Sequence, residues 1–186
     1  MKLAIIMSGF GGQGVMSMGQ LLAYAAMDEG REVTWLPSYG PEMRGGAAYC
    51  TVVVSDRPVG SPLTTRPDAC IIMNRPSLDK FEEAVKPGGI LVLNTSLCDR
   101  LPGRDDLTLV ALPVTDIASD LGDFRVANMV ALGAFLEVEP VVKSSSVLEA
   151  LKKTLPEHRR HLLPLNEKAL EAGALEARKR LQDRTA

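Results

Sequence analysis

A glycine-rich segment near the amino terminus is the part of the sequence best suited to binding chemistry. Residues 9–14 read Gly-Phe-Gly-Gly-Gln-Gly and follow a short apolar run. Because glycine has no side chain, a phosphate or a partner backbone can come close to the N–H groups of such a loop. A tight strand-to-helix turn that binds nothing is the alternative. The candidate ligand-contacting residues here are Gly9, Gly11, Gly12, Gln13 and Gly14.

A second glycine-bearing segment follows at residues 38–46. Tyr39 offers a ring and a hydroxyl, and Arg44 could bind a phosphate or carboxylate with two hydrogen bonds or pair with Glu42. Two such loops so close together suggest one face built for recognition. The candidate ligand-contacting residues of this segment are Ser38, Tyr39, Gly40, Glu42, Arg44, Gly45 and Gly46.

The spacing of Gly9, Gly11 and Gly14 matches a dinucleotide-binding motif, but the rest of that motif is missing. The motif needs an acidic residue about 20 positions later, at the end of the second strand. That strand ends here in Trp-Leu-Pro-Ser at residues 35–38, and Glu32 lies at its start. A P-loop fails as well, because no Lys-Ser/Thr pair follows the glycines.

No metal site is predicted. Cys50, Cys70 and Cys98 are far apart and lack CxxC spacing, so we expect buried free thiols rather than zinc or cluster ligands. His158 and His161 flank two arginines, but no third ligand lies near them in the sequence. A basic helix end explains this pair better than a metal site does.

Composition excludes several classes of protein. The chain has 186 residues, 46% of them hydrophobic, and a formal net charge of −2, so we expect neither nucleic acid nor an anionic membrane as a partner. No apolar run approaches the ~20 residues that span a bilayer, and no signal-peptide pattern begins the chain. Single cysteines fit a reducing cytoplasm, which is the location we predict.

Apolar runs and stretches of helical periodicity alternate along the chain and predict the elements that carry the loops. The predicted strands cover residues 2–7, 32–36, 47–54, 69–73, 90–93 and 107–112. The predicted helices cover residues 14–29, 76–86, 115–121, 126–136, 144–155 and 162–181, the last interrupted by Pro164 and Gly173.

This order of elements predicts an α/β fold: a layered αβα domain with a mixed, mostly parallel sheet and a helical C-terminal extension. The first strand, helix and second strand form a βαβ-like unit, for which a neighbouring parallel pair is the default. A short strand near Val59 is expected to form a hairpin with residues 47–54. No linker divides the chain, so residues 1–186 are predicted to form one domain.

In residue sequence and in their order along the chain, the two glycine-bearing loops resemble those of the gamma subunit of the 2-oxoacid:ferredoxin oxidoreductases. The resemblance covers almost the whole chain and includes Pro67-Asp68 before a strand and the run Asn128 to Gly133, with weaker support from residues 166–173. The second loop is most similar to that of the 2-oxoglutarate and branched-chain members. The resemblance implies a single gamma-type domain.

The resemblance also implies a reaction and a division of labour. A 2-oxoacid such as 2-oxoglutarate or pyruvate would be decarboxylated on thiamine diphosphate, its acyl group passed to coenzyme A, and its electrons passed through iron–sulfur clusters to ferredoxin. Thiamine diphosphate would belong mainly to alpha and beta subunits and the clusters to a delta subunit. This chain would bind no cofactor alone, supply no catalytic residue, be inactive in isolation, and shape the coenzyme A side of the site.

The sequence is also compatible with two other functional hypotheses. One is a stand-alone nucleotide- or coenzyme-binding α/β protein that uses the first glycine loop. The other is a homo-oligomeric scaffold without a ligand. Within the family interpretation, the two loops would contact either coenzyme A or only partner subunits.

Overall fold

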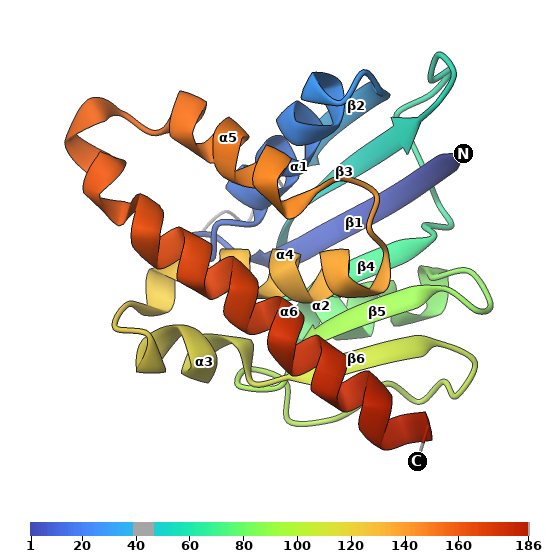
Figure 1. Ribbon diagram of the computed structural model, residues 1–186. Helices are drawn as coiled ribbons and strands as arrows, with labels where there is room; N and C mark the ends of the chain where they lie inside the picture. The colour runs from blue at the N-terminus through green and yellow to red at the C-terminus, as the bar shows by residue number, and fades with distance from the viewer. Residues whose placement is uncertain (39–46, 186) are drawn as a thin grey trace.

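The computed structural model describes residues 1–38 and 47–185, and within them six strands form one sheet (Figure 1). The strands are β1 (Lys2–Phe10), β2 (Glu32–Ser38), β3 (Ala47–Ser55), β4 (Ala69–Ile72), β5 (Ile90–Asn94) and β6 (Thr108–Leu112). Their spatial order is β2-β3-β1-β4-β5-β6. The β1–β4, β4–β5 and β5–β6 pairs are parallel, and β3 is antiparallel to both of its neighbours. The predicted mixed, mostly parallel sheet is confirmed.

Helices cover both faces of this sheet. The α-helices are α1 (Val15–Asp28), α2 (Arg75–Phe81), α3 (Val114–Asp120), α4 (Ala127–Val138), α5 (Ser144–Thr154) and α6 (Leu163–Thr185). Short 3₁₀ turns are η1 (Glu82–Ala84), η2 (Phe124–Val126) and η3 (Glu157–Leu162). None of these helices is long and apolar enough to cross a membrane.

The two faces of the sheet bury separate apolar clusters. The larger cluster joins one face to α1, α3, α4, α5 and α6, and the smaller joins the other face to α2. In Figure 1, α6 passes in front of α4 and α2 lies behind the sheet. The layered αβα architecture and the helical C-terminal extension are therefore as predicted.

One prediction about the sheet was wrong: β1 and β2 are not neighbours. β3 lies between them and pairs with both, so that Val52 is the register partner of Ile5 on one side and of Trp35 on the other. Val52 and its neighbour Val53 are almost fully buried, which suits an interior strand. Pro37 lacks an N–H donor, which suits the sheet edge that β2 occupies.

The predicted hairpin near Val59 was also wrong. Residues 56–68 contain neither strand nor helix, and the mixed character of the sheet comes from β3 instead. Pro58, Pro62 and Pro67 fall in this stretch. Each removes a donor that a ladder of hydrogen bonds would need, so the segment cannot pair regularly.

The longest helix is held against α4 by two glycines. A Cβ added to Gly133 would lie 1.9 Å from the Leu170 carbonyl oxygen, and one added to Gly173 would lie 1.9 Å from the Val130 carbonyl oxygen. α6 runs through Gly173 without the predicted interruption, and Pro164 falls in its first turn, where no N–H is needed. The two helices therefore approach backbone to backbone.

This close approach makes Gly133 sensitive to a single added carbon. We expect Gly133→Ala to lower the free energy of unfolding by about 3 kcal/mol, because backbone atoms on both helices would have to separate. Urea unfolding of the purified chain measures the change. Gly60→Ala is the matched control: no atom lies within 4 Å of its added Cβ, so its effect should stay below about 0.5 kcal/mol. Equal losses in both variants would contradict the close-packing explanation.

Candidate functional site

The flanks of both glycine-bearing segments lie at the same end of the sheet. Gly9 and Phe10 at the end of β1 are register partners of residues 48 and 47 in β3, and Ser38 at the end of β2 is the partner of Tyr49. Ser38 is thus two strand spacings, about 10 Å, from β1. The other predicted residues of the second loop lie outside the described residues: Tyr39, Gly40, Glu42, Arg44, Gly45 and Gly46.

The first glycine loop lies at the topological switch point of the sheet, where the helices that follow two neighbouring strands cover opposite faces. The helix that follows β1 covers one face, and the helix that follows β4 covers the other, while β1 and β4 are parallel neighbours. In open α/β sheets, ligands bind in the crevice outside the carboxyl ends of two such strands. Strand order therefore makes this edge the candidate site.

The Gln13 side chain closes the glycine loop onto the end of β4. Its Oε1 accepts hydrogen bonds from the Phe10 N–H (2.6 Å) and from Asn74 Nδ2 (3.2 Å), and its Nε2 donates to the Met73 carbonyl (3.2 Å). A Cβ on Gly9 would lie 2.5 Å from Gln13 Oε1 and 2.9 Å from Met73 Cβ. Glycine is therefore required at position 9 by the amide that holds the loop.

Two buried asparagines continue this polar network along the strand ends. Asn74 caps α2 by accepting from the Ser77 N–H (3.0 Å). Asn94, at the end of β5, donates through Nδ2 to the Met73 carbonyl (3.1 Å) and to Thr115 Oγ1 (2.9 Å). Both asparagines are fully buried. Sequence reasoning missed them, although an asparagine at or just after each of two buried strands was a usable signal.

The remaining glycines of the loop have two different environments. Gly14 has φ +72° and packs against Asn128 at the start of α4, where an added Cβ would lie 2.7 Å from Asn128 Nδ2. Gly12 has φ +94°, and no atom lies within 4 Å of the position its Cβ would take. Gly11 and Gly12 are exposed. The backbone at these two residues is thus open to a ligand or a partner chain.

A cavity of about 350 Å³ lies beside this open backbone. It is lined by the loop, by Leu97 after β5, by Thr115 in α3, and by Phe124 and Arg125 of η2. Leu97 and Phe124 keep 44% and 63% of their surface exposed, which is high for large apolar side chains. The cavity thus combines bare amides, apolar walls and a guanidinium, a set that suits an amphipathic anion or a partner segment.

The charge on the cavity wall is partly compensated. Arg125 Nη2 lies 2.6 Å from Asp123 Oδ2, and this pair raises the pKa of the arginine and lowers that of the aspartate. The Asp123 side chain is only 16% exposed, but its partner Arg125 lies largely in solvent, so the pair contributes little to stability. The Arg125 guanidinium remains 70% exposed and able to contact an anion.

The cysteines are structural. Cys50, Cys70 and Cys98 are buried and free, as predicted, and burial raises the pKa of their thiols to about 12, 12 and 11. Protonated thiols of this kind are poor nucleophiles and poor metal ligands. Among residues 1–38 and 47–185, no three His, Cys, Asp or Glu side chains converge on a point where a metal ion could bind.

Comparison with known proteins places the chain in a family. A family model described as pyruvate ferredoxin/flavodoxin oxidoreductase matches residues 4–176, and the chain belongs to this family. It is 40% identical over 182 residues to the ketoisovalerate oxidoreductase subunit VorA of Methanothermobacter marburgensis. That match covers 97% of this chain but only 38% of VorA, so the chain spans well under half of this relative.

Two solved structures share the fold. The gamma subunit of a keto/oxoacid ferredoxin oxidoreductase from Geobacter sulfurreducens superposes with a TM-score of 0.81 at 33% identity, covering 94% of this chain and 98% of that one. The 2-oxoglutarate:ferredoxin oxidoreductase of Magnetococcus marinus, with 2-oxoglutarate, coenzyme A and succinyl-CoA bound, gives a TM-score of 0.87 at 26% identity, covering 96% of this chain and 31% of that one. The resemblance found in the sequence is confirmed.

The Gln13 network provides a direct test of the site's architecture. We expect Gln13→Leu to lower the free energy of unfolding by about 2 kcal/mol, because the Phe10 N–H and the Met73 carbonyl would each lose a partner. The matched control is Gln20→Leu, which removes only the exposed hydrogen bond to Tyr24 and should cost less than about 0.5 kcal/mol. Urea unfolding gives both values, and a Gln13→Leu protein as stable as the control would contradict this role.

Proposed function

We propose that this chain acts as the gamma-type component of a 2-oxoacid:ferredoxin oxidoreductase. The main observation behind the proposal is the exposed backbone of Gly11 and Gly12. It lines a cavity at the topological switch point of the sheet. Family membership and the full-length match to a gamma subunit support it. The reaction would convert a 2-oxoacid to an acyl-CoA and reduce ferredoxin.

The proposed role is to shape the coenzyme A side of the site and to pack against partner subunits. Coenzyme A is a large amphipathic anion, and the cavity offers it three suitable features. Bare N–H groups at Gly11 and Gly12 can meet phosphate oxygens, the exposed Phe124 ring and Leu97 can cover apolar parts, and Arg125 can pair with negative charge. The chain's own residues would bind and orient the coenzyme and exclude water from it.

The remaining cofactors are proposed to belong to other subunits. Thiamine diphosphate is usually held through a metal ion, and the described residues contain no cluster of ligands for one. Cys50 belongs to the apolar cluster on one face of the sheet, whereas Cys70 and Cys98 belong to the cluster on the other face, so the three thiols do not form one ligand set. When bound by partner subunits, thiamine diphosphate would supply decarboxylation and iron–sulfur clusters would carry the electrons. The cytoplasmic location expected from the sequence stays a prediction.

The stand-alone dinucleotide enzyme is the less favoured alternative. β2 ends at Ser38 without the carboxylate that would hold a ribose, and Gln13 Oε1 already occupies one amide of the loop, the Phe10 N–H. We propose a 2-oxoacid of the 2-oxoglutarate or branched-chain class as the substrate of the assembly. The VorA relative is named for ketoisovalerate and the Magnetococcus marinus enzyme for 2-oxoglutarate, in agreement with the class that the second loop resembles.

Purification from the native source tests the assembly. We expect an affinity-tagged chain to bring down thiamine-binding and cluster-bearing partners, and the assembly to oxidise a 2-oxoacid only when coenzyme A and ferredoxin are supplied. The isolated chain should be inactive under the same conditions. Recovery of the chain alone, or turnover of an oxoacid by the chain alone, would contradict the proposal.

Substitution of the exposed Gly12 tests whether the glycine loop contributes to coenzyme A binding in that assembly. We expect Gly12→Ala to reduce kcat/KM for coenzyme A by about tenfold or more, because an added side chain would obstruct the exposed amides and strain a backbone at positive φ. Gly88→Ala is the matched control, since Gly88 also has positive φ (+73°) and free space around its Cβ but lies at the opposite end of the sheet. Similar losses in both variants would show a folding effect rather than a binding role.

A further inference from the structure

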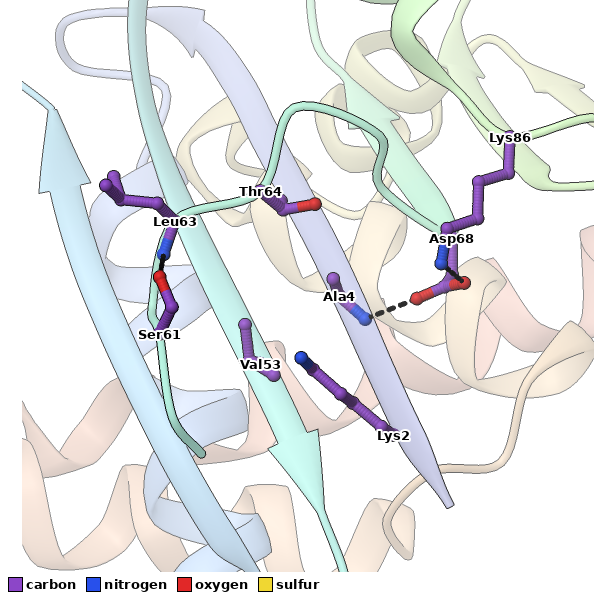
Figure 2. Close-up of a pocket in the computed structure, with 8 residues that line it drawn as sticks. All are labelled: Lys2, Ala4, Val53, Ser61, Leu63, Thr64, Asp68 and Lys86. Carbon is purple, nitrogen blue, oxygen red and sulfur yellow. Dashed lines mark hydrogen bonds and ion pairs between the residues drawn. The ribbon is translucent and has the colours of Figure 1, made fainter. Parts of the chain in front are cut away.

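A second hollow, of about 270 Å³, lies at the amino end of the sheet, opposite the candidate site (Figure 2). Its floor is the register pair Ala4 on β1 and Val53 on β3, both of them buried. The segment from Ser61 to Thr64 crosses above this floor and forms a wall. The space is many times the ~30 Å³ that one water molecule takes up in the liquid, so it can hold a small organic molecule.

Asp68 on the edge of the hollow is already fully engaged. Its Oδ2 accepts from the Ala4 N–H (2.8 Å), and its Oδ1 lies 2.5 Å from Lys86 Nζ. This pattern explains the aspartate that precedes β4 in the sequence, because it ties the beginning of β4 to β1. It also means that Lys86 offsets the Asp68 charge, leaving neither group in need of a further partner.

Lys2 leaves one positive charge uncompensated in the hollow. Figure 2 shows its side chain extending over the floor toward Val53, with the Thr64 hydroxyl turned into the same space. Within the described residues, neither the Lys2 ammonium nor the Thr64 hydroxyl has a hydrogen-bond or ion-pair partner. With Asp68 and Lys86 cancelling, the lining carries a net charge of about +1 next to an apolar floor.

We propose that this hollow binds a short aliphatic carboxylate. The carboxylate accepts hydrogen bonds from Lys2 Nζ and the Thr64 hydroxyl, and the hydrocarbon part lies over Ala4 and Val53. A single negative charge matches the single uncompensated ammonium, and the described lining residues offer no second unpaired cation to a ligand of higher charge. The site is separate from the carboxyl-end cavity, so the proposal does not depend on the proposed function.

Titration of the isotope-labelled full chain by NMR tests the site, with butyrate as the probe. At constant ionic strength, butyrate should shift the amide signals of Ala4, Leu63 and Thr64 in a saturable way, with a dissociation constant on the order of 1 mM. Propionate should bind roughly fourfold more weakly, since it buries one methylene fewer. Butanol lacks the charge and inorganic phosphate lacks the apolar part, so both should bind more weakly than butyrate.

Two variants locate the binding. Lys2→Gln should weaken butyrate binding by about tenfold, while the unfolding transition stays unchanged because Lys2 is exposed. Lys168→Gln, at an exposed lysine of α6, removes the same charge elsewhere and should leave binding unchanged. The proposal is overturned if butyrate causes no saturable shift, if phosphate binds more tightly than butyrate, or if the two lysine variants behave alike.

Discussion

The hydrogen bonds of one amide, that of Gln13, determine the geometry of the candidate site. This side chain satisfies the Phe10 N–H within its own loop and the Met73 carbonyl at the end of the neighbouring strand. A glycine-rich loop has many accessible conformations, and ordering it costs entropy that the loop's own contacts cannot offset. Gln13 supplies contacts that hold the loop in one of those conformations, and Gly9 leaves the space that its oxygen needs.

The helical layer supports the same loop from the other side. α4 begins beside Gly14, where Asn128 Nδ2 lies 3.4 Å from the Gly14 carbonyl oxygen. The position of α4 in turn depends on its backbone contact with α6 through Gly133 and Gly173. The close packing of α4 on α6 thus supports the position of the residue that contacts Gly14, because densely packed interiors transmit displacements. The segments 128–133 and 166–173, which resemble the family in sequence, are the ones that make these contacts.

The two ends of the parallel strands have different roles. At the carboxyl end, bare amides and exposed Phe124 and Leu97 form a surface that suits a cofactor and partner subunits. At the amino end, Asp68 joins β4 to β1 and borders a smaller polar hollow. Both arrangements follow from strand order, since parallel strands bring all of their carboxyl ends to one edge and all of their amino ends to the other.

Much of the fold was predictable because the relevant signals are local. Every predicted strand except the one near Val59 is present, and α1 and its terminating Gly30, which has φ +76°, lie where helical periodicity and a glycine stop placed them. The glycines of the first loop were identified as residues that leave backbone N–H groups uncovered, and the structure shows Gly11 and Gly12 exposed and Gly12 and Gly14 at positive φ. Whether they bind a ligand remains a prediction.

Strand order and the partners of individual side chains were decided only in three dimensions. The insertion of β3 between β1 and β2 depends on which strands gain most from pairing, and a pattern within one strand carries no information about its neighbours. The convergence of Gln13, Asn74 and Asn94, which are up to 81 residues apart, depends on that order. By itself the sequence determined the elements, their turns and the family, because these depend on residue type and spacing. Only the tertiary structure decided which polar groups meet at the strand ends, because those contacts form between residues distant in the chain.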